Sequence, residues 1–405
     1  MGCRSGGGHY SLQLGRSPSK DKMRVLHVID SLAGSGGAEQ GLVREVTRFS
    51  GGTDQLVVTL YNRMELADRL RERKIPVEVI GLEEGSGSRT WPKAVAALRR
   101  IARETRPDVI QTSLFLGNLV GQLAGRSLRI PVVSNLVLSG DIESLRSYQP
   151  GASTRRAQLL RAVAGWAARS DLVRFRALTE EVKTTNSVLL GVDPARVTVI
   201  PRGVPRPPAT TPPTLAELGL PQGPLVVNVG RLAPQKGQVL LVEAFATVLE
   251  TVPNAHLAIL GREGESSADV AAAIDRHGLT DSVTLVGHTT RVADYLGNAH
   301  VFAFASLMEG LGTAVLEAMA IGVPVVAFDI PPVREATVDG RFGTLVPVGD
   351  VAGLASALTG HLAAGRRVDA PARDWVRERH DLSRIAGEVE LLLAEAAASA
   401  RPDAR

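Results

Sequence analysis

A glycine-flanked loop in the second half of the chain carries two cations spaced for anion binding. It reads GRLAPQKG at residues 230–237 and follows a β-branched run at 225–229. Arg231 and Lys236 therefore stand where the loop leaves a predicted strand. Two cations at the carboxyl end of a parallel strand can neutralise a diphosphate, arginine through its planar fork and lysine as a movable point charge. On their own, an arginine and a lysine in a loop are more often solvated surface charges.

A second stretch, EGLGTAVLE at residues 309–317, joins a predicted strand to a predicted helix. Gly310 and Gly312 leave the backbone open, and a helix that begins at Thr313 points its free amides into the loop, which favours phosphate. Glu317 lies one turn inside this helix among apolar neighbours, where an unpaired carboxylate is costly. Two adjacent hydroxyls, as on a ribose, would satisfy it. The alternative is a glutamate that simply stabilises a helix start.

The elements that would position these loops alternate, from Met23 onward, between short β-branched runs and longer helical patterns, which is typical of parallel sheets. In the first half we expect strands at 24–29, 55–60, 77–80, 108–112 and 131–136. In the second half we expect strands at 225–229, 256–260, 283–286, 301–303, 323–328 and 344–346. Ligands of such sheets bind beyond the carboxyl ends of the strands. Both charged stretches fall on one such edge, so coincidence becomes the weaker explanation.

Eight prolines between residues 200 and 224 exclude a helix or a central strand there and place a domain boundary. We therefore expect an α/β protein with two tandem Rossmann-like, doubly wound domains that face a central cleft. The expected parts are a disordered leader at 1–22, a first domain at 23–200, a proline-rich linker at 201–224, a second domain at 225–375 and a tail at 376–405. The tail holds an amphipathic helix that can pack back on the first domain.

In combination, these motifs resemble family-four glycosyltransferases of the GT-B fold. The resemblance rests on EGLGTAVLEAMAIGVPVVA, the preceding GRLAPQKG, the following Glu335 and the GTLVPVGD segment, and it covers most of residues 23–400. Its hallmark is a pair of glutamates with seven residues between them, which Glu309 and Glu317 match. The resemblance implies a retaining enzyme that takes a sugar from a nucleoside diphosphate sugar, with the acceptor on the first domain and the donor on the second.

The resemblance also implies a role for each matching charged residue. Arg231 and Lys236 would hold the donor pyrophosphate, and Glu317 would hold the donor ribose. Glu309 would hold hydroxyls of the transferred sugar. The residues assigned to catalysis are Glu309, Arg231 and Lys236.

Further donor contacts are implied for backbone and small residues. Amides that cradle the sugar and phosphate come from Gly310, Leu311, Gly312 and Thr313. The loop around Gly287 and His288 is similar to the one that reads the nucleotide base. In the first domain, GSGGAE at 34–39 supplies Gly36 and Gly37, which match the family's glycine pair. Because Glu39 occupies the third glycine position, the dinucleotide fingerprint is broken. A plain tight turn is the alternative.

The first domain departs from many relatives, which carry a histidine on its sugar-facing loops. No histidine lies between His27 and His256, and His27 alternates with apolar neighbours, so we expect it to pack in the core. The polar residues on these loops are acceptor-side candidates: Ser113, Asn118, Ser139 and Asp141. Loop polarity alone would also explain them. The glycine pair usual before Glu335 is replaced by Pro331 and Pro332.

The composition argues against several other kinds of protein. The 405 residues are 44% apolar and 22% charged, as in ordinary globular proteins, and the one cysteine, Cys3, allows neither a disulfide network nor a cysteine-bound metal. An aromatic content of 4% and a net charge of +4 argue against nucleic acid as a partner. No apolar run could span a bilayer and no secretion signal is recognisable, so we expect a cytoplasmic protein. A basic stretch at 153–171 could touch anionic lipid at the membrane periphery, but a core-facing helix is the stronger interpretation.

These features predict a retaining, metal-independent glycosyltransferase that needs no cofactor besides its nucleotide-sugar donor. We expect the two cations and the helix amides to stabilise the departing diphosphate, whose oxygen accepts the proton of the acceptor hydroxyl. The loops do not reveal whether the acceptor is a glycan, a lipid-linked sugar or a small molecule. Two alternatives remain open: a sugar-nucleotide epimerase of the same fold, and a non-catalytic relative that binds nucleotide sugars.

Overall fold

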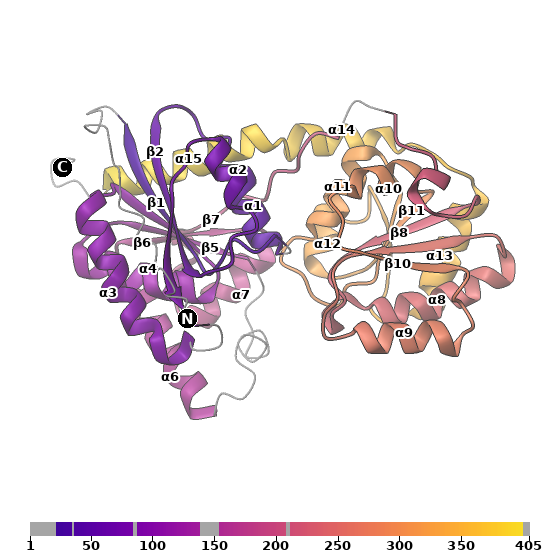
Figure 1. Cartoon of the computed structure of the whole chain (residues 1–405), viewed down its shortest axis with the longest axis horizontal. Helices are drawn as coiled ribbons and strands as arrows, with labels where there is room; N and C mark the ends of the chain where they lie inside the picture. The colour runs from indigo at the N-terminus through magenta and orange to yellow at the C-terminus, as the bar shows by residue number, and fades with distance from the viewer. Residues whose placement is uncertain (1–21, 35, 84–86, 138–153, 208–210, 400–405) are drawn as a thin grey trace, which may run out of the picture.

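The computed structural model describes residues 22–399, apart from Ser35 and residues 84–86, 138–153 and 208–210. Apart from Lys22, the expected leader lies outside this range. Figure 1 shows two α/β domains side by side, the first coloured indigo to magenta and the second orange. The prediction of two Rossmann-like domains in tandem is confirmed.

The first domain is built on a seven-stranded parallel sheet of order β3-β2-β1-β4-β5-β6-β7. Its strands are β1 (Met23–Ile29), β2 (Thr53–Tyr61), β3 (Val77–Leu82), β4 (Val109–Ser113), β5 (Val132–Leu136), β6 (Val173–Ala177) and β7 (Val197–Val199). Its helices are α1 (Gly37–Val46), α2 (Ala67–Glu72), α3 (Gly87–Thr105), α4 (Phe115–Leu128), α6 (Thr154–Ala168) and α7 (Glu180–Leu190), with a 3₁₀ turn η1 (Pro194–Arg196). Every residue of β4 and β5 is buried, as expected for parallel strands covered on both faces.

The second domain is built on a six-stranded parallel sheet of order β10-β9-β8-β11-β12-β13. Its strands are β8 (Leu225–Val229), β9 (His256–Leu260), β10 (Val283–Gly287), β11 (Val301–Phe304), β12 (Val325–Phe328) and β13 (Thr344–Val346). Its helices are α8 (Gln238–Thr251), α9 (Ser267–Arg276), α10 (Val292–Asn298), α11 (Thr313–Ile321), α12 (Pro331–Ala336), α13 (Val351–Ala363) and α14 (Ala370–Arg379), with a 3₁₀ turn η3 (Pro234–Lys236). In both sheets the strand order reverses beside the first strand, which is where open α/β sheets bind ligands.

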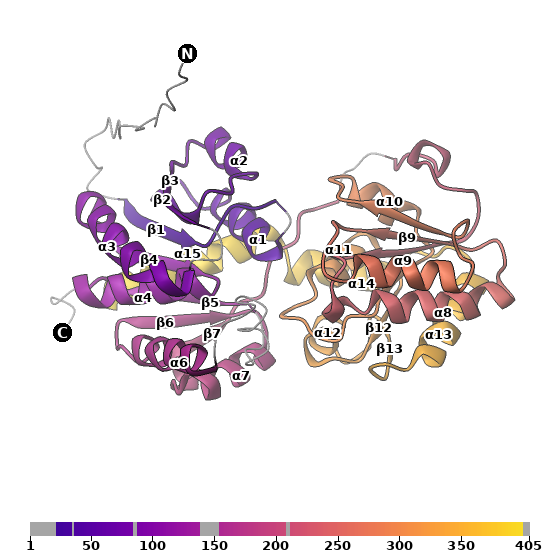
Figure 2. The same cartoon turned by 60° about the horizontal axis from the view of Figure 1, so that its bottom comes forward.

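The chain passes between the domains twice, and the two crossings touch. The proline-rich linker contains a 3₁₀ turn, η2 (Ala216–Leu218), and a bridge between Val204 and Asp381. Helix α15 (Leu382–Ser399) then returns to the first domain and lies along it in Figures 1 and 2. Its Ile385, Val389 and Leu393 share a buried cluster with the first sheet.

The basic stretch at 153–171 forms α6 in part of its length. Leu160 and Ala164 are buried, whereas Leu159 and Trp166 are exposed, and Arg126 stacks over the Trp166 ring at 4.0 Å. Contact of this helix with lipid stays a prediction. Within the described residues, no helix is both long and apolar enough to cross a membrane.

Candidate active site

The strand order of the second sheet reverses between β8 and β11, and the loops after these two strands carry the predicted charges. Lys236 Nζ lies 2.5 Å from Glu309 Oε1. Both side chains are largely buried, with exposed fractions of 23% and 11%. The Leu307 amide donates to the Gln235 carbonyl over 2.8 Å, so the two loops are also joined through the backbone. The structure thus brings Lys236 and Glu309 together, as their predicted roles require.

A glycine after Lys236 makes this loop possible. Gly237 has φ = +61°, a conformation that disfavours residues with a Cβ. A Cβ on Gly237 would also overlap the Ala305 carbonyl oxygen, at the end of β11. The glycine therefore lets the β8 loop pack directly against the β11 loop.

Helix α11 begins at Thr313, as predicted. Its N-cap is Gly312, at φ = +73°, and no side chain caps the helix. No side chain therefore competes with a ligand for the first-turn amides, of which that of Val315 donates to the Gly312 carbonyl over 2.8 Å. Gly310 and Leu311 are buried, and the Gly310 carbonyl accepts a hydrogen bond from Thr179 Oγ1 of the first domain over 3.2 Å. This loop lies against the first domain.

Glu317 also faces the first domain. Its Oε1 accepts a bond from Arg44 Nη1 of α1 over 2.7 Å, and 21% of the side chain is exposed. The carboxylate is thus shielded, as the apolar neighbours predict. A cation from the other domain compensates its charge.

Arg231 is paired within its own domain. Its Nη1 lies 2.7 Å and 2.8 Å from the two carboxylate oxygens of Glu265. The Glu265 side chain is 61% exposed, and its own backbone amide, then Arg231, hold the pKa of this carboxyl below its usual range. An ion pair this exposed contributes little stability. Arg231 can therefore exchange Glu265 for another anion at small energetic cost.

The loop predicted to read the nucleotide base lies on the same sheet edge. Gly287 ends the edge strand β10, and its carbonyl accepts the Gly261 amide over 2.9 Å. The Gly230 amide donates to Leu260 over 2.8 Å, so the ends of three neighbouring strands are joined in series. His288 is exposed. Base recognition by this loop stays a prediction.

In the first domain, Gly36 is the N-cap of α1 and Gly37 is its first residue. Neither has a positive φ among the described residues. A Cβ on Gly36 would overlap the carboxylate of Glu39, and burial raises the pKa of Glu39 above its ordinary value. Gly37 O accepts a bond from Arg202 Nη1. The predicted contact of the glycine pair with the donor phosphate remains untested.

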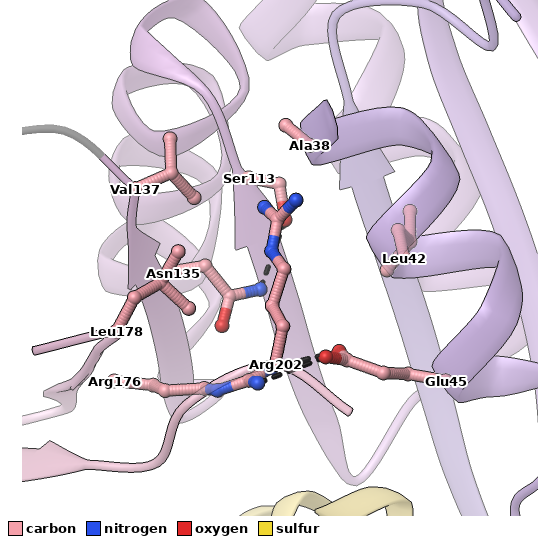
Figure 3. A pocket seen from close by; sticks show the side chains of 9 residues that line it. All are labelled: Ala38, Leu42, Glu45, Ser113, Asn135, Val137, Arg176, Leu178 and Arg202. Carbon is pink, nitrogen blue, oxygen red and sulfur yellow. Dashed lines mark hydrogen bonds and ion pairs between the residues drawn. The ribbon is translucent and has the colours of Figure 1, made fainter. Parts of the chain in front are cut away.

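A small polar cavity lies between α1 and the carboxyl ends of β4, β5 and β6 (Figure 3). Its lining consists of Ala38, Leu42, Glu45, Ser113, Asn135, Val137, Arg176, Leu178 and Arg202. Arg176 Nη1 and Nη2 bind the two oxygens of Glu45 over 2.7 Å and 2.8 Å, with both side chains almost fully buried. Burial lowers the pKa of Arg202 to about 10, so this arginine stays charged at neutral pH. The cavity has room for about one water molecule.

The acceptor-side candidates are placed differently from one another. Ser113 lines the cavity, and its Oγ accepts Asn135 Nδ2 over 2.9 Å. Asn118 braces the sheet edge, because its Oδ1 accepts Thr112 Oγ1 over 2.7 Å and its Nδ2 donates to the Asn135 carbonyl over 3.1 Å. Ser139 and Asp141 lie outside the described residues.

The two prolines before Glu335 start a helix. Pro331 occupies the first turn of α12, where its missing amide is harmless. Glu335 Oε2 accepts the backbone amide of Glu180 over 3.0 Å, and burial raises the pKa of Glu335. Another residue of the candidate region thus touches the first domain.

Several residues of this region were not predicted, namely Arg44, Glu45, Arg176, Thr179 and Arg202. A signal existed for two of them. Glu45 interrupts an apolar helix face and Arg176 an apolar strand, and buried charges of opposite sign in such positions indicate a pair. Arg44, Thr179 and Arg202 carry no comparable signal, because their partners are far away in the sequence.

Comparison with known proteins identifies the family of this chain. Residues 20–203 match the model of the glycosyl transferase 4-like domain, and residues 215–370 match that of the group 1 glycosyl transferases. The 2-deoxystreptamine N-acetyl-D-glucosaminyltransferase of Streptomyces fradiae is 31% identical over 76% of this chain and 77% of its own length. The chain belongs to the GT-B glycosyltransferases. It is therefore an enzyme that transfers glycosyl groups.

Other relatives of this glycosyltransferase extend over nearly the whole chain. The 2-deoxystreptamine glucosyltransferase of Streptomyces kanamyceticus is 27% identical over 90% of this chain and 96% of its own length. Among solved structures, Anabaena HepE in complex with UDP superposes with a TM-score of 0.77 at 22% identity, over 92% of this chain and 100% of that one. This likeness supports the two-domain GT-B fold.

Proposed function

We propose that this glycosyltransferase takes its sugar from a nucleoside diphosphate sugar and transfers it with retention of anomeric configuration. The observation that carries the proposal is the contact between Lys236 and Glu309 beside the free N-terminus of α11. This contact supports the proposal, because a cation beside helix amides favours a diphosphate and a neighbouring acid can bind sugar hydroxyls. HepE, which has the same fold, was crystallised with UDP and with UDP-glucose.

The main barrier in such a transfer is charge separation, because the bond from the sugar C1 to the diphosphate oxygen breaks as the sugar becomes oxocarbenium-like. Lys236, Arg231 and the amides of Gly312 and Thr313 stabilise the negative charge on the leaving group. The acceptor oxygen then bonds to C1 on the same face, and its proton passes to the departing phosphate oxygen. These cations do the work that a divalent metal would do, so we propose a metal-independent reaction without a further cofactor.

The experiment uses a panel of UDP-, GDP- and ADP-sugars with the full chain. Nucleotide release is measured together with thermal unfolding, because a bound donor stabilises the fold by mass action. We expect one donor to raise the melting temperature and to release nucleotide equally well in EDTA. Lys236→Ala should lower that release by about 10²- to 10³-fold, the usual loss for one preorganised donor to a developing anion.

A matched control is Lys93→Ala, which removes an exposed lysine from α3, a helix of the first domain that packs on α4 and β3. Its nucleotide release should equal that of the wild type. If no donor stabilises the protein, or if Lys236→Ala keeps full turnover, the proposal is wrong. Retention is checked by nuclear magnetic resonance of the product's anomeric proton.

A further inference from the structure

Two polar contacts from the first domain end on residues of the candidate donor site, and a third ends on Glu335 of α12. Arg44 Nη1 donates to Glu317 over 2.7 Å, Thr179 Oγ1 donates to the Gly310 carbonyl over 3.2 Å, and the Glu180 amide donates to Glu335 over 3.0 Å. The first domain therefore holds the very groups that are expected to hold the donor. Two of these contacts are made by side chains and can be removed by substitution.

Arg44 is fixed from its own side of the domain boundary. Its Nη2 donates to Gln40 Oε1 over 3.2 Å, and Gln40 Nε2 donates to the Gly34 carbonyl over 2.6 Å. Only 24% of the Arg44 side chain is exposed. Neighbouring residues on α1 point into the first-domain core, among them Leu42, Val43 and Val46. Arg44 thus leaves the helix toward the second domain in a defined orientation.

Thr179 is fully buried and uses its hydroxyl twice. Its Oγ1 accepts the Val182 amide over 3.2 Å as the N-cap of α7, and it donates its hydrogen to Gly310 O. Because both capacities of the hydroxyl are filled, the position of the Gly310 carbonyl is tied to the start of α7. That carbonyl directly precedes the amides of residues 311–313.

We propose that Arg44 and Thr179 are positioning residues for the donor. Arg44 orients Glu317 and neutralises it, and Thr179 fixes the loop whose amides face the phosphates. The proposal rests on the proposed function, because it assigns these residues to the same donor site. It adds that the first domain, besides its acceptor side, completes the site on the second.

Charge decides whether loss of Arg44 weakens or strengthens donor binding. Without Arg44, Glu317 would be a mostly buried carboxylate with no cation, facing a donor whose diphosphate is doubly negative. One carboxylate oxygen is held by Arg44, and the other remains to accept a ribose hydroxyl. Loss of Arg44 therefore weakens donor binding. If Arg44 instead competed with the ribose for Glu317, its loss would strengthen binding.

The test compares Arg44→Gln with Arg44→Lys, and Thr179→Val with Thr179→Ser, in the full chain. The binding probes are UDP, GDP and ADP, which share ribose and diphosphate, and dissociation constants are measured by calorimetry with whichever nucleotide binds the wild type. We expect Arg44→Gln to weaken binding by about tenfold, the value of one charge-assisted hydrogen bond. The lysine variant should recover most of this loss.

Thr179→Val keeps the shape of the side chain and removes the hydroxyl. We expect it to lower kcat for nucleotide release by about tenfold, because misaligned amides stabilise the leaving group less well. Thr179→Ser should restore kcat. If Thr179→Val melts at a lower temperature than Thr179→Ser, its lower kcat reflects lost stability. The positioning role is then judged from Arg44→Gln and Arg44→Lys.

Arg24→Gln serves as the control, because Arg24 belongs to a similarly buried ion pair with Asp108 at the opposite end of β1. Its nucleotide binding should match that of the wild type. Glu317→Gln separates the two proposals. If it leaves nucleotide binding unchanged, the proposed donor site is wrong. If it weakens binding while Arg44→Gln has no effect or strengthens binding, only the positioning role is overturned.

Discussion

The two sheets have the same strand order around their first strand. They differ in how exposed the ion pairs are near the switch point, which is the place where the strand order reverses. At the first switch point, Arg176 and Glu45 form a bidentate pair that is almost fully buried, with Arg202 beside it. At the second, Arg231 and Glu265 form a pair exposed to solvent, and the contact of Lys236 with Glu309 retains some exposure. One topology therefore supports a fixed charged scaffold in one domain and exchangeable ion pairs in the other.

The largest effect on stability is expected for Glu45→Ala, which removes the carboxylate of the buried pair. It leaves the Arg176 guanidinium buried without a carboxylate and removes one of the two carboxylates, Glu45 and Glu39, that act on Arg202. Removal of one partner of a buried pair typically costs about 3–5 kcal/mol. We expect a loss of that size in the free energy of unfolding, measured with urea. Arg71→Ala, which breaks the exposed pair with Asp68, is the control and should cost under about 1 kcal/mol. If Glu45→Ala and Arg71→Ala lose equal free energy of unfolding, the buried pair does not stabilise the fold more than an exposed pair.

Gly237→Ala tests the second switch point. The αL conformation alone costs about 1–2 kcal/mol, and the overlap with the Ala305 carbonyl adds the cost of forcing the two loops apart. Gly278→Ala is the matched control, since Gly278 has φ = +65° and no neighbour near the added Cβ. We expect Gly237→Ala to lose roughly 2 kcal/mol more than the control, together with nucleotide release. A loss no larger than that of Gly278→Ala would show that the loops are not tightly packed.

Protonation of His27, in the first domain, should contribute to the pH dependence of stability. His27 is fully buried, as predicted, and burial lowers its pKa from 6.5 to about 4. Because the folded protein binds this proton less readily than the unfolded chain, stability is complete above pH 6.5 and falls as the pH drops toward 4. Between pH 7 and pH 5 the loss from this group is about 2 kcal/mol.

His27→Gln should flatten that slope in urea titrations. His256→Gln, in the second sheet, is the control. Its ring is buried as well, with Nε2 2.8 Å from Thr284 Oγ1, but burial lowers its pKa less. The interpretation fails if the two variants change the slope equally.

Arg231→Gln should give the smallest change in stability. Its partner Glu265 is exposed, so the pair contributes about 0–1 kcal/mol. We expect unfolding within about 0.5 kcal/mol of the wild type, whereas nucleotide release falls clearly. A large loss of stability would place Arg231 among the structural residues.

The sequence predicted a helix or strand correctly where the residues of that element alone carry its pattern. The bounds of β8, β9 and β13 and the start of α11 agree with the predictions, because apolar periodicity and flanking glycines or prolines mark them in the sequence. Strands β6 and β7 were missed. In β6, Arg174 and Arg176 interrupt the apolar pattern, and only the tertiary partner Glu45 makes a buried Arg176 acceptable.

The candidate site was predictable to the extent that its residues cluster in the chain. Lys236 and Glu309 follow adjacent parallel strands, so their meeting follows from topology. Arg44 meets Glu317 across 273 positions, and no local pattern in α1 points to it. Contacts between domains depend on how two surfaces dock. The local spacing of residue types along the chain does not specify that docking.

The return of α15 to the first domain has a consequence for synthesis on the ribosome. The apolar side chains of Val25, Val109, Val133 and Ile200 are buried against a helix that begins at Leu382. Roughly 180 residues separate that helix from β7, and at about 5–20 residues per second they take roughly ten to forty seconds to translate. During this interval these apolar side chains of the first domain lack the helix that covers them in the folded chain.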